Sequence, residues 1–176
     1  MRHKLLTLGA LGLAALTVTA AAFAGTLTTT GTITGAAGIS MTLPANPSFT
    51  NTLDGTDQTV LYTALLGVTD ARGSGAGWNL QISATNFSDG LGHTLLPGAV
   101  SAITAACVAG SACTAATNAI TYPLTVTGTA VKFYTAAANT GMGKVNVTPT
   151  VNVTVPGNTF AGTYTSTVTL AAVSGP

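Results

Sequence analysis

Residue types that often carry chemistry are scarce in this 176-residue chain. There is no glutamate, and the four aspartates lie in turn-forming segments. Glycoside hydrolysis would require two of these aspartates to converge in the fold, because it uses a pair of carboxyl groups. His93 stands alone in a glycine-rich turn, where a histidine is more often a surface residue than a general base. We therefore predict no catalytic residue, and a secreted enzyme is the least favoured function.

Metal and phosphate sites are not predicted either. Residues 54–57 (Asp-Gly-Thr-Asp) offer oxygen ligands for a weak Ca²⁺ site. Aspartates beside glycine more often bond their own backbone in a turn, and we favour that interpretation. Residues 73–77 are glycine-rich but lack the Lys-Ser/Thr pair and the helix of a phosphate-binding loop. We expect a flexible loop there, no metal and no cofactor.

Cys107 and Cys113 are the only cysteines. In an exported chain such a pair typically forms a disulfide, and the alternative is two unlinked small hydrophobic residues. The bridge would close a loop of about seven residues and contribute roughly 2 kcal/mol before strain is subtracted. Zinc binding is not expected, because no second Cys or His cluster completes four ligands.

The N-terminus predicts an export signal. A short basic region precedes an almost wholly apolar run over residues 5–20, and Ala22-Phe23-Ala24 has the small-x-small form that a signal peptidase recognises. The alternative is an uncleaved anchor, but the run falls below the ~18 to 20 residues that a membrane span needs. We expect a signal peptide over residues 1–24 and a single secreted domain over residues 25–176, with no membrane attachment after cleavage.

The charge of the expected mature chain is very low. Three cations face four aspartates, so the net charge is near −1. Nucleic-acid binding is not predicted, because its dominant electrostatic term needs a basic patch. Binding to anionic lipid is not predicted either, because the chain has no polybasic segment. Abundant threonine, alanine, glycine and valine are typical of a rigid secreted β-protein with a hydroxyl-rich surface.

Period-two patterns predict strands along the chain. As a strand, Trp78-Asn79-Leu80 would place Trp78 and Leu80 on one face, together with Ile82 and Ala84, and Asn79 on the other. Trp78 is the only tryptophan. A tryptophan and a leucine two apart on a half-buried strand are what a sandwich core would use, so we favour a core role for Trp78 over a binding role. An intermediate alternative buries Trp78 at a rim and leaves the Asn79 face and Tyr164 available for contacts.

Other segments complete the pattern. Residues 60–69 and 163–173 each predict a strand, and residues 97–118 predict a loop closed by the disulfide. Residues 144–155 alternate most clearly, except that Pro149 indicates an edge, a bulge or two strands meeting. We predict an all-β fold, an antiparallel β-sandwich of about seven to nine strands with Ig-like or Greek-key connections.

The run from Val68 to Leu80 carries an aspartate and glycines into Trp78-Asn79-Leu80, and it resembles the proximal motif of WxL-domain surface proteins of Gram-positive bacteria. Residues 161–170, which include Tyr164, resemble the lead-in to the distal motif of that family. Leu170 stands where the second tryptophan would be, and Ala172 where its leucine would be. The resemblance implies a secreted β-rich domain held non-covalently on peptidoglycan, with roles in surface assemblies or adhesion.

Two functions follow as hypotheses. The first is a non-catalytic cell-surface module that contacts peptidoglycan or other surface proteins, with Trp78, Asn79, Leu80 and Tyr164 as candidate contact residues. The second is a self-assembling subunit of a pilus, filament or surface layer. In that case the threonine-rich segment Gly25–Thr34 would add to the sheet edge of a neighbour. Both place the protein outside the cell or on its wall.

Overall fold

A computed structural model describes residues 28–176, and its folded body spans residues 33–176. The expected signal peptide, its cleavage site and residues 25–27 lie outside the described residues. No helix occurs in the described part of the chain, and hence none that is long and apolar enough to cross a membrane. Its strands are β1 (Ile39–Thr42), β2 (Gln58–Thr63), β3 (Leu66–Asp70), β4 (Trp78–Ala84), β5 (Phe87–Ser88), β6 (Thr94–Leu95), β7 (Ala99–Cys107), β8 (Leu124–Thr125), β9 (Val131–Ala136), β10 (Gly143–Val155) and β11 (Val168–Ser174).

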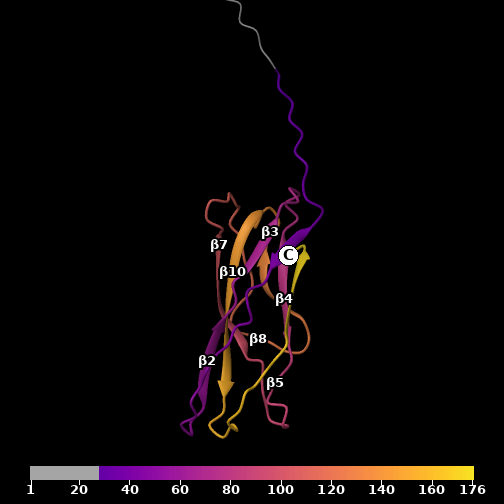
Figure 1. The fold of residues 1–176 in the computed structure, drawn as a ribbon. Helices are drawn as coiled ribbons and strands as arrows, with labels where there is room; N and C mark the ends of the chain where they lie inside the picture. Colours follow the sequence, from indigo (N-terminus) through magenta and orange to yellow (C-terminus); the bar gives the residue numbers. More distant parts are fainter. Residues whose placement is uncertain (1–27) are drawn as a thin grey trace, which may run out of the picture. The chain divides into compact units, whose positions relative to one another are not determined.

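The larger sheet is built around β10. This strand pairs antiparallel with β7 along one side, and with β3 and then β2 along the other (Figure 1). Its valines are buried and its polar residues face outward, because side chains alternate along a strand. β1 extends the sheet beyond β3, and β8 extends it beyond β7. The alternation predicted for residues 144–155 is confirmed.

Pro149 marks the point where β10 changes partners. Val147 is the last residue of β10 that pairs with β3, and Thr150 is the first that pairs with β2. The carbonyl oxygen of Pro149 accepts a hydrogen bond of 3.3 Å from the backbone N–H of Ala64, in the break between β2 and β3. A proline has no N–H to donate, so it is tolerated where the ladder is interrupted. A register shift on the β7 side follows at Thr150, so Pro149 combines two of the expected features.

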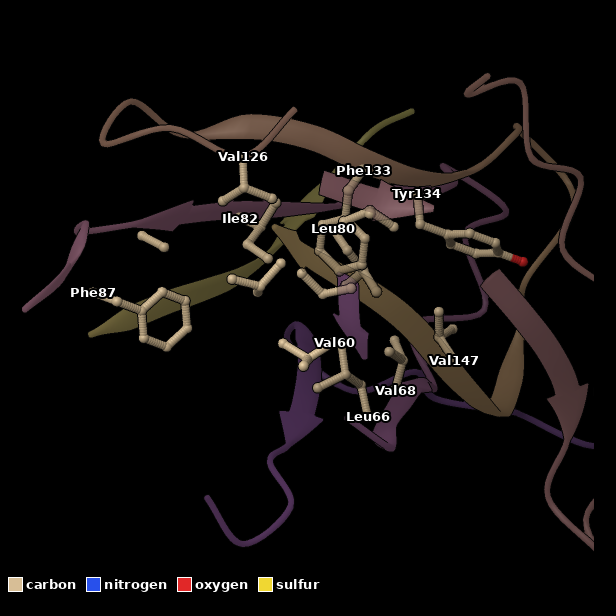
Figure 2. Packing of buried hydrophobic residues seen from close by; sticks show 14 of the residues in the cluster. Val60, Leu66, Val68, Leu80, Ile82, Phe87, Val126, Phe133, Tyr134 and Val147 are labelled. Carbon is tan, nitrogen blue, oxygen red and sulfur yellow. The ribbon is translucent and has the colours of Figure 1, made fainter. Parts of the chain in front are cut away.

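The smaller sheet has the order β11-β4-β9, with the Trp78 strand at its centre. The short β5–β6 hairpin forms a third sheet. Apolar side chains of the two main sheets meet in one core, and Figure 2 shows Leu80, Ile82 and Phe133 pointing toward Val60 and Leu66. The predicted inward face of β4 is confirmed, because Trp78, Leu80, Ile82 and Ala84 are all buried. The fold is an antiparallel all-β sandwich, as predicted.

Three sequence-based assignments need correction. The loop expected over residues 97–118 is wrong in its first half, because Ala99–Cys107 forms the nine-residue strand β7. Small residues make up most of this strand and only Val100 is fully buried, so the sequence shows no apolar period. Pairing with β10 orders the strand instead. The single strand expected over residues 60–69 is two strands, β2 and β3. The last strand begins at Val168 rather than at residue 163.

Candidate functional site

The Trp78 side chain is locked inside the sandwich. Its indole Nε1 donates a hydrogen bond of 2.9 Å to the carbonyl oxygen of Gly141, and its ring packs 5.7 Å from that of Tyr134. Gly77 enters the strand with a φ of +70°, which favours glycine. A Cβ at Gly77 would also lie 2.5 Å from the carbonyl oxygen of Ala136. The turn before the tryptophan therefore requires glycine on two independent grounds.

An ion pair closes the same end of the sandwich. Asp70 is buried at the end of β3, and its carboxylate accepts hydrogen bonds of 2.8 and 2.9 Å from the Arg72 guanidinium. These hydrogen bonds lower the pKa of Asp70 and raise that of Arg72. Arg72 also donates to the carbonyl oxygen of Gly77 at 2.8 Å and to the hydroxyl of Ser174. One arginine thus joins the end of β3, the turn before Trp78 and the end of β11.

Asn79 on β4 links this strand to the residue that follows β11. The side chain is buried, and its amide donates a hydrogen bond of 2.7 Å to the carbonyl oxygen of Gly175. Its amide oxygen accepts one of 3.0 Å from Gln81. The outward face expected for Asn79 is therefore correct in register, but the residue is not available to solvent. Its polar groups are used within the chain.

The two motif segments are neighbours in the smaller sheet. Leu80 lies opposite Ala172, and Ile82 lies opposite Leu170, across the β4–β11 ladder. The positions that resemble the distal motif therefore pair directly with the strand of the proximal motif. Tyr164 precedes β11 and does not join this ladder.

A cleft of about 1,110 Å³ opens between the two main sheets, away from the Trp78 end. β1 lies against β11, and residues 43–53, which follow β1 without forming a strand, line the cleft. Its other walls come from β2, β4, β5, β6, β10 and β11, and from residues 159–167. Tyr164 and Leu170 line the cleft, whereas Trp78, Asn79 and Leu80 do not. The structure thus separates the candidate residues into two regions.

The lining of the cleft carries no charged side chain. Aromatic rings supply much of it, and Phe49 stacks on Tyr62 at 6.3 Å and meets the edge of Phe87 at 5.6 Å. Burial raises the pKa of Tyr62. Burial and then the charge of Asp89 raise the pKa of Tyr164. Both phenols are therefore neutral at neutral pH, since an unperturbed tyrosine has a pKa of about 10.

The turn of the β5–β6 hairpin packs against one wall of the cleft. His93 Nδ1 lies 2.5 Å from an Asp89 carboxylate oxygen, and the His93 ring stacks on Phe160 at 3.9 Å. Burial opposes ionisation of Asp89, but hydrogen bonds from His93 and from backbone N–H groups outweigh it and lower the Asp89 pKa. The Tyr164 hydroxyl donates a hydrogen bond of 3.0 Å to the carbonyl oxygen of Phe160. His93, predicted as a surface turn residue, is half-buried and supports an aromatic wall.

The remaining candidate sites are resolved by local contacts. Asp54 Oδ1 accepts hydrogen bonds of 2.7 Å from the Thr56 hydroxyl and 2.9 Å from the Thr56 backbone N–H, and these lower the pKa of Asp54. The backbone hydrogen bond confirms the predicted turn. Cys107 and Cys113 form the expected disulfide, with their Cα atoms 5.7 Å apart. No group of three or more potential His, Cys, Asp or Glu metal ligands occurs within residues 28–176.

Comparison with known proteins places the chain in a family. The family model described as "WxL domain surface cell wall-binding" matches residues 40–174, which include every strand except part of β1. Searches among curated proteins and among solved structures found no match. The match spans both segments whose resemblance the sequence indicated, and the structure pairs them in one sheet. The chain therefore belongs to the WxL-domain family of surface, cell-wall-binding domains.

Proposed function

We propose that this protein is a non-catalytic, secreted module that attaches non-covalently to the cell wall through the cleft between its sheets. The observation that carries the proposal is the cleft itself, a large, uncharged, aromatic-lined hollow within the matched region. Its volume of about 1,110 Å³ slightly exceeds the roughly 300–1,000 Å³ typical of ligand sites. A wall polymer or a segment of another surface protein is the expected occupant.

The Trp78 segment has a supporting role in this proposal. Trp78 and Leu80 have no exposed surface, and only 3% of Asn79 is exposed. Their contacts fix β4 against β11, whose other end contributes Val168 and Leu170 to the cleft. Among the residues predicted as contacts, Tyr164 is the one that would meet a ligand directly. The motif would therefore matter for binding because it shapes the sheet.

The sites in the described chain do not favour catalysis. Asp70 and Asp89 are each held by a neighbouring cationic or imidazole side chain, and Asp54 is held by its own turn. General acid–base catalysis needs a group poised beside the reacting bond, and the cleft lining contains no carboxylate and no imidazole. Binding without turnover is the function that this lining supports best.

Sedimentation with purified wall sacculi tests the proposal. The secreted chain should co-sediment, and denaturant should release it intact, because the attachment is non-covalent. Phe160→Ala should weaken co-sedimentation, because Phe160 lines the cleft. Leu91→Ala is the matched control, since Leu91 is 82% exposed and lies outside the cleft lining. Failure of the unmodified chain to co-sediment would reject wall binding.

We also propose self-association through Gly25–Thr34 as a second function. The specific observation is that residues 28–34 are exposed and form no strand, with the Ile33 side chain 99% exposed. β11 pairs only with β4 among the described strands, so its other edge, which β1 contacts without pairing, has no strand partner and is a candidate for strand addition by a second copy. A near-zero net charge weakens repulsion between copies.

Light scattering at high concentration tests this second proposal. The secreted chain should form higher-order species, and Ile33→Asp should shift them to monomers by placing a charge in the added strand. Thr30→Asp is a control of equal charge on the opposite strand face. Monodisperse monomers at all concentrations would reject self-association.

A further inference from the structure

We propose, resting on the wall-binding function above, that the cleft takes the uncharged sugar chain of the wall glycan. Stem peptides and anionic wall polymers would then not be its ligands. Walls present chemically different surfaces: an N-acetylated sugar backbone, peptides with ionised groups, and polymers with phosphate groups. The lining of the cleft discriminates among them by charge, by aromatic content and by its polar groups.

Charge is the first discriminator. None of the residues that line the cleft is Lys, Arg, Asp, Glu or His. An anionic polymer would therefore lose hydration in the cleft without gaining an ionic partner, which is unfavourable for a buried charge. The described cations lie elsewhere: Arg72 is held by Asp70, and Lys132 and Lys144 are exposed outside the lining. An uncharged ligand avoids this desolvation cost.

Aromatic rings are the second discriminator. Phe49, Tyr62, Phe87, Phe160 and Tyr164 all line the cleft. Pyranose rings present an apolar face of C–H groups, which packs on aromatic faces, while the sugar hydroxyls point outward. Phe160 is 62% exposed, so one face of this wall is available to a ligand without unfolding. Rigid aromatic surfaces bind at low entropic cost, because few rotatable bonds are fixed.

Polar groups around the aromatic floor suit a sugar chain as well. Residues 45–52 and 159–167 bring asparagine, serine and threonine side chains to the lining. Neutral hydroxyls and amides can both donate and accept hydrogen bonds, as sugar hydroxyls and acetamido groups require. No backbone–backbone hydrogen bond joins residues 43–57 to another described segment, so this wall can adjust with little cost. The Thr159 hydroxyl also borders the cleft, buried and without a partner in the described chain.

The test uses a hexasaccharide of β-1,4-linked N-acetylglucosamine as the probe, with the secreted chain in titration calorimetry. We expect saturable binding that changes little between about 0.1 and 1 M salt, over which the Debye length falls from roughly 10 to 3 Å. The same hexasaccharide should compete with sacculi in sedimentation. Phe160→Ala should weaken hexasaccharide affinity about tenfold, equivalent to about 1.4 kcal/mol. Tyr164→Phe should retain more affinity than Tyr164→Ala, because the ring remains.

Leu61→Ala is the matched control, since Leu61 neighbours Tyr62 on β2 but is exposed on the opposite face. Its affinity should equal that of the unmodified chain, and an equal loss in both variants would overturn the cleft as the site. Emission of the single, buried tryptophan confirms that each variant is folded. If sacculi are bound but the hexasaccharide neither binds nor competes, the sugar assignment is wrong and wall binding stands. If sacculi are not bound either, the proposed function itself fails.

Discussion

The two ends of the sandwich differ in what their side chains contact. At the Trp78 end, polar side chains bond to other parts of the chain, and the largest rings have no exposed surface. At the cleft, the aromatic side chains other than Phe87 are partly exposed, and one wall has no strand structure. The segment that resembles the motif of the family is therefore part of the buried framework, and the cleft that we propose for binding lies away from it.

This division follows from what each region can gain in free energy. A buried tryptophan whose N–H has a hydrogen-bond acceptor stabilises the fold whether or not a ligand is bound. Exposed rings such as Phe160 contribute little to the fold, because they remain in contact with water. An aromatic side chain that remains exposed, and so adds little to the stability of the fold, is available to contact a ligand. Substitutions at the two ends should accordingly separate stability from binding.

The largest effect is expected at Trp78. Trp78→Ala should lower the free energy of unfolding by roughly 3–5 kcal/mol, because it leaves a cavity in a packed core. It would also orphan the carbonyl oxygen of Gly141. Urea unfolding followed by far-UV circular dichroism measures the loss. Trp78→Phe should recover part of it by restoring a ring, and a stable Trp78→Ala protein that merely loses wall binding would make Trp78 a contact residue.

The Arg72 cluster should show the next largest effect. Arg72→Met should cost roughly 1–3 kcal/mol, since it leaves the buried carboxylate of Asp70 without its main donor. Lys144→Met removes the same charge from an exposed position and should change stability by no more than about 0.5 kcal/mol. Chemical unfolding of both variants makes the comparison. Equal costs would mean that net charge, rather than this cluster, determines the difference.

The sequence predicted the framework better than the cleft, for physical reasons. Period-two alternation predicts which face of the strand Trp78, Leu80 and the valines of β10 occupy. This pattern can be detected without knowing which strands pair with each other. β7 was missed because small residues carry no apolar period, and β10 orders it through backbone bonds. The family resemblance located both motif segments, but not the direct pairing of Leu80 with Ala172.

The cleft had no sequence signal of its own. Phe49, Tyr62, Phe87 and Phe160 lie in separate segments, and no spacing rule connects them. Residues 43–53 line the cleft without forming a strand, and their course over it is a property of tertiary packing. Pro44 and Pro47 were a usable hint, since they lack the N–H groups a strand would need. Two prolines so close together favour a loop, but they carry no information about what that loop would line.

Acid should weaken the framework through Asp70. Hydrogen bonds from Arg72 lower the folded-state pKa of this carboxyl below its unfolded value of about 3.9. Its stabilising contribution is therefore complete above that unfolded pKa, and it is lost as the pH falls through the folded pKa. Unfolding free energies measured from pH 6 to pH 2 should fall less steeply for Asp70→Asn than for the unmodified chain. Parallel pH profiles would show that Asp70 does not carry this dependence.

The smallest effect on stability is expected at the cleft, and it gives the clearest test of the difference between the cleft and the Trp78 end. Phe160→Ala should change the free energy of unfolding by no more than about 0.5 kcal/mol, as for other exposed positions. The lost stacking on His93 sets the upper part of that range. Thermal unfolding and wall sedimentation of the same preparation provide both readouts. A large loss of stability with unchanged wall binding would make this aromatic wall part of the framework, and the two ends of the sandwich would then have the same role.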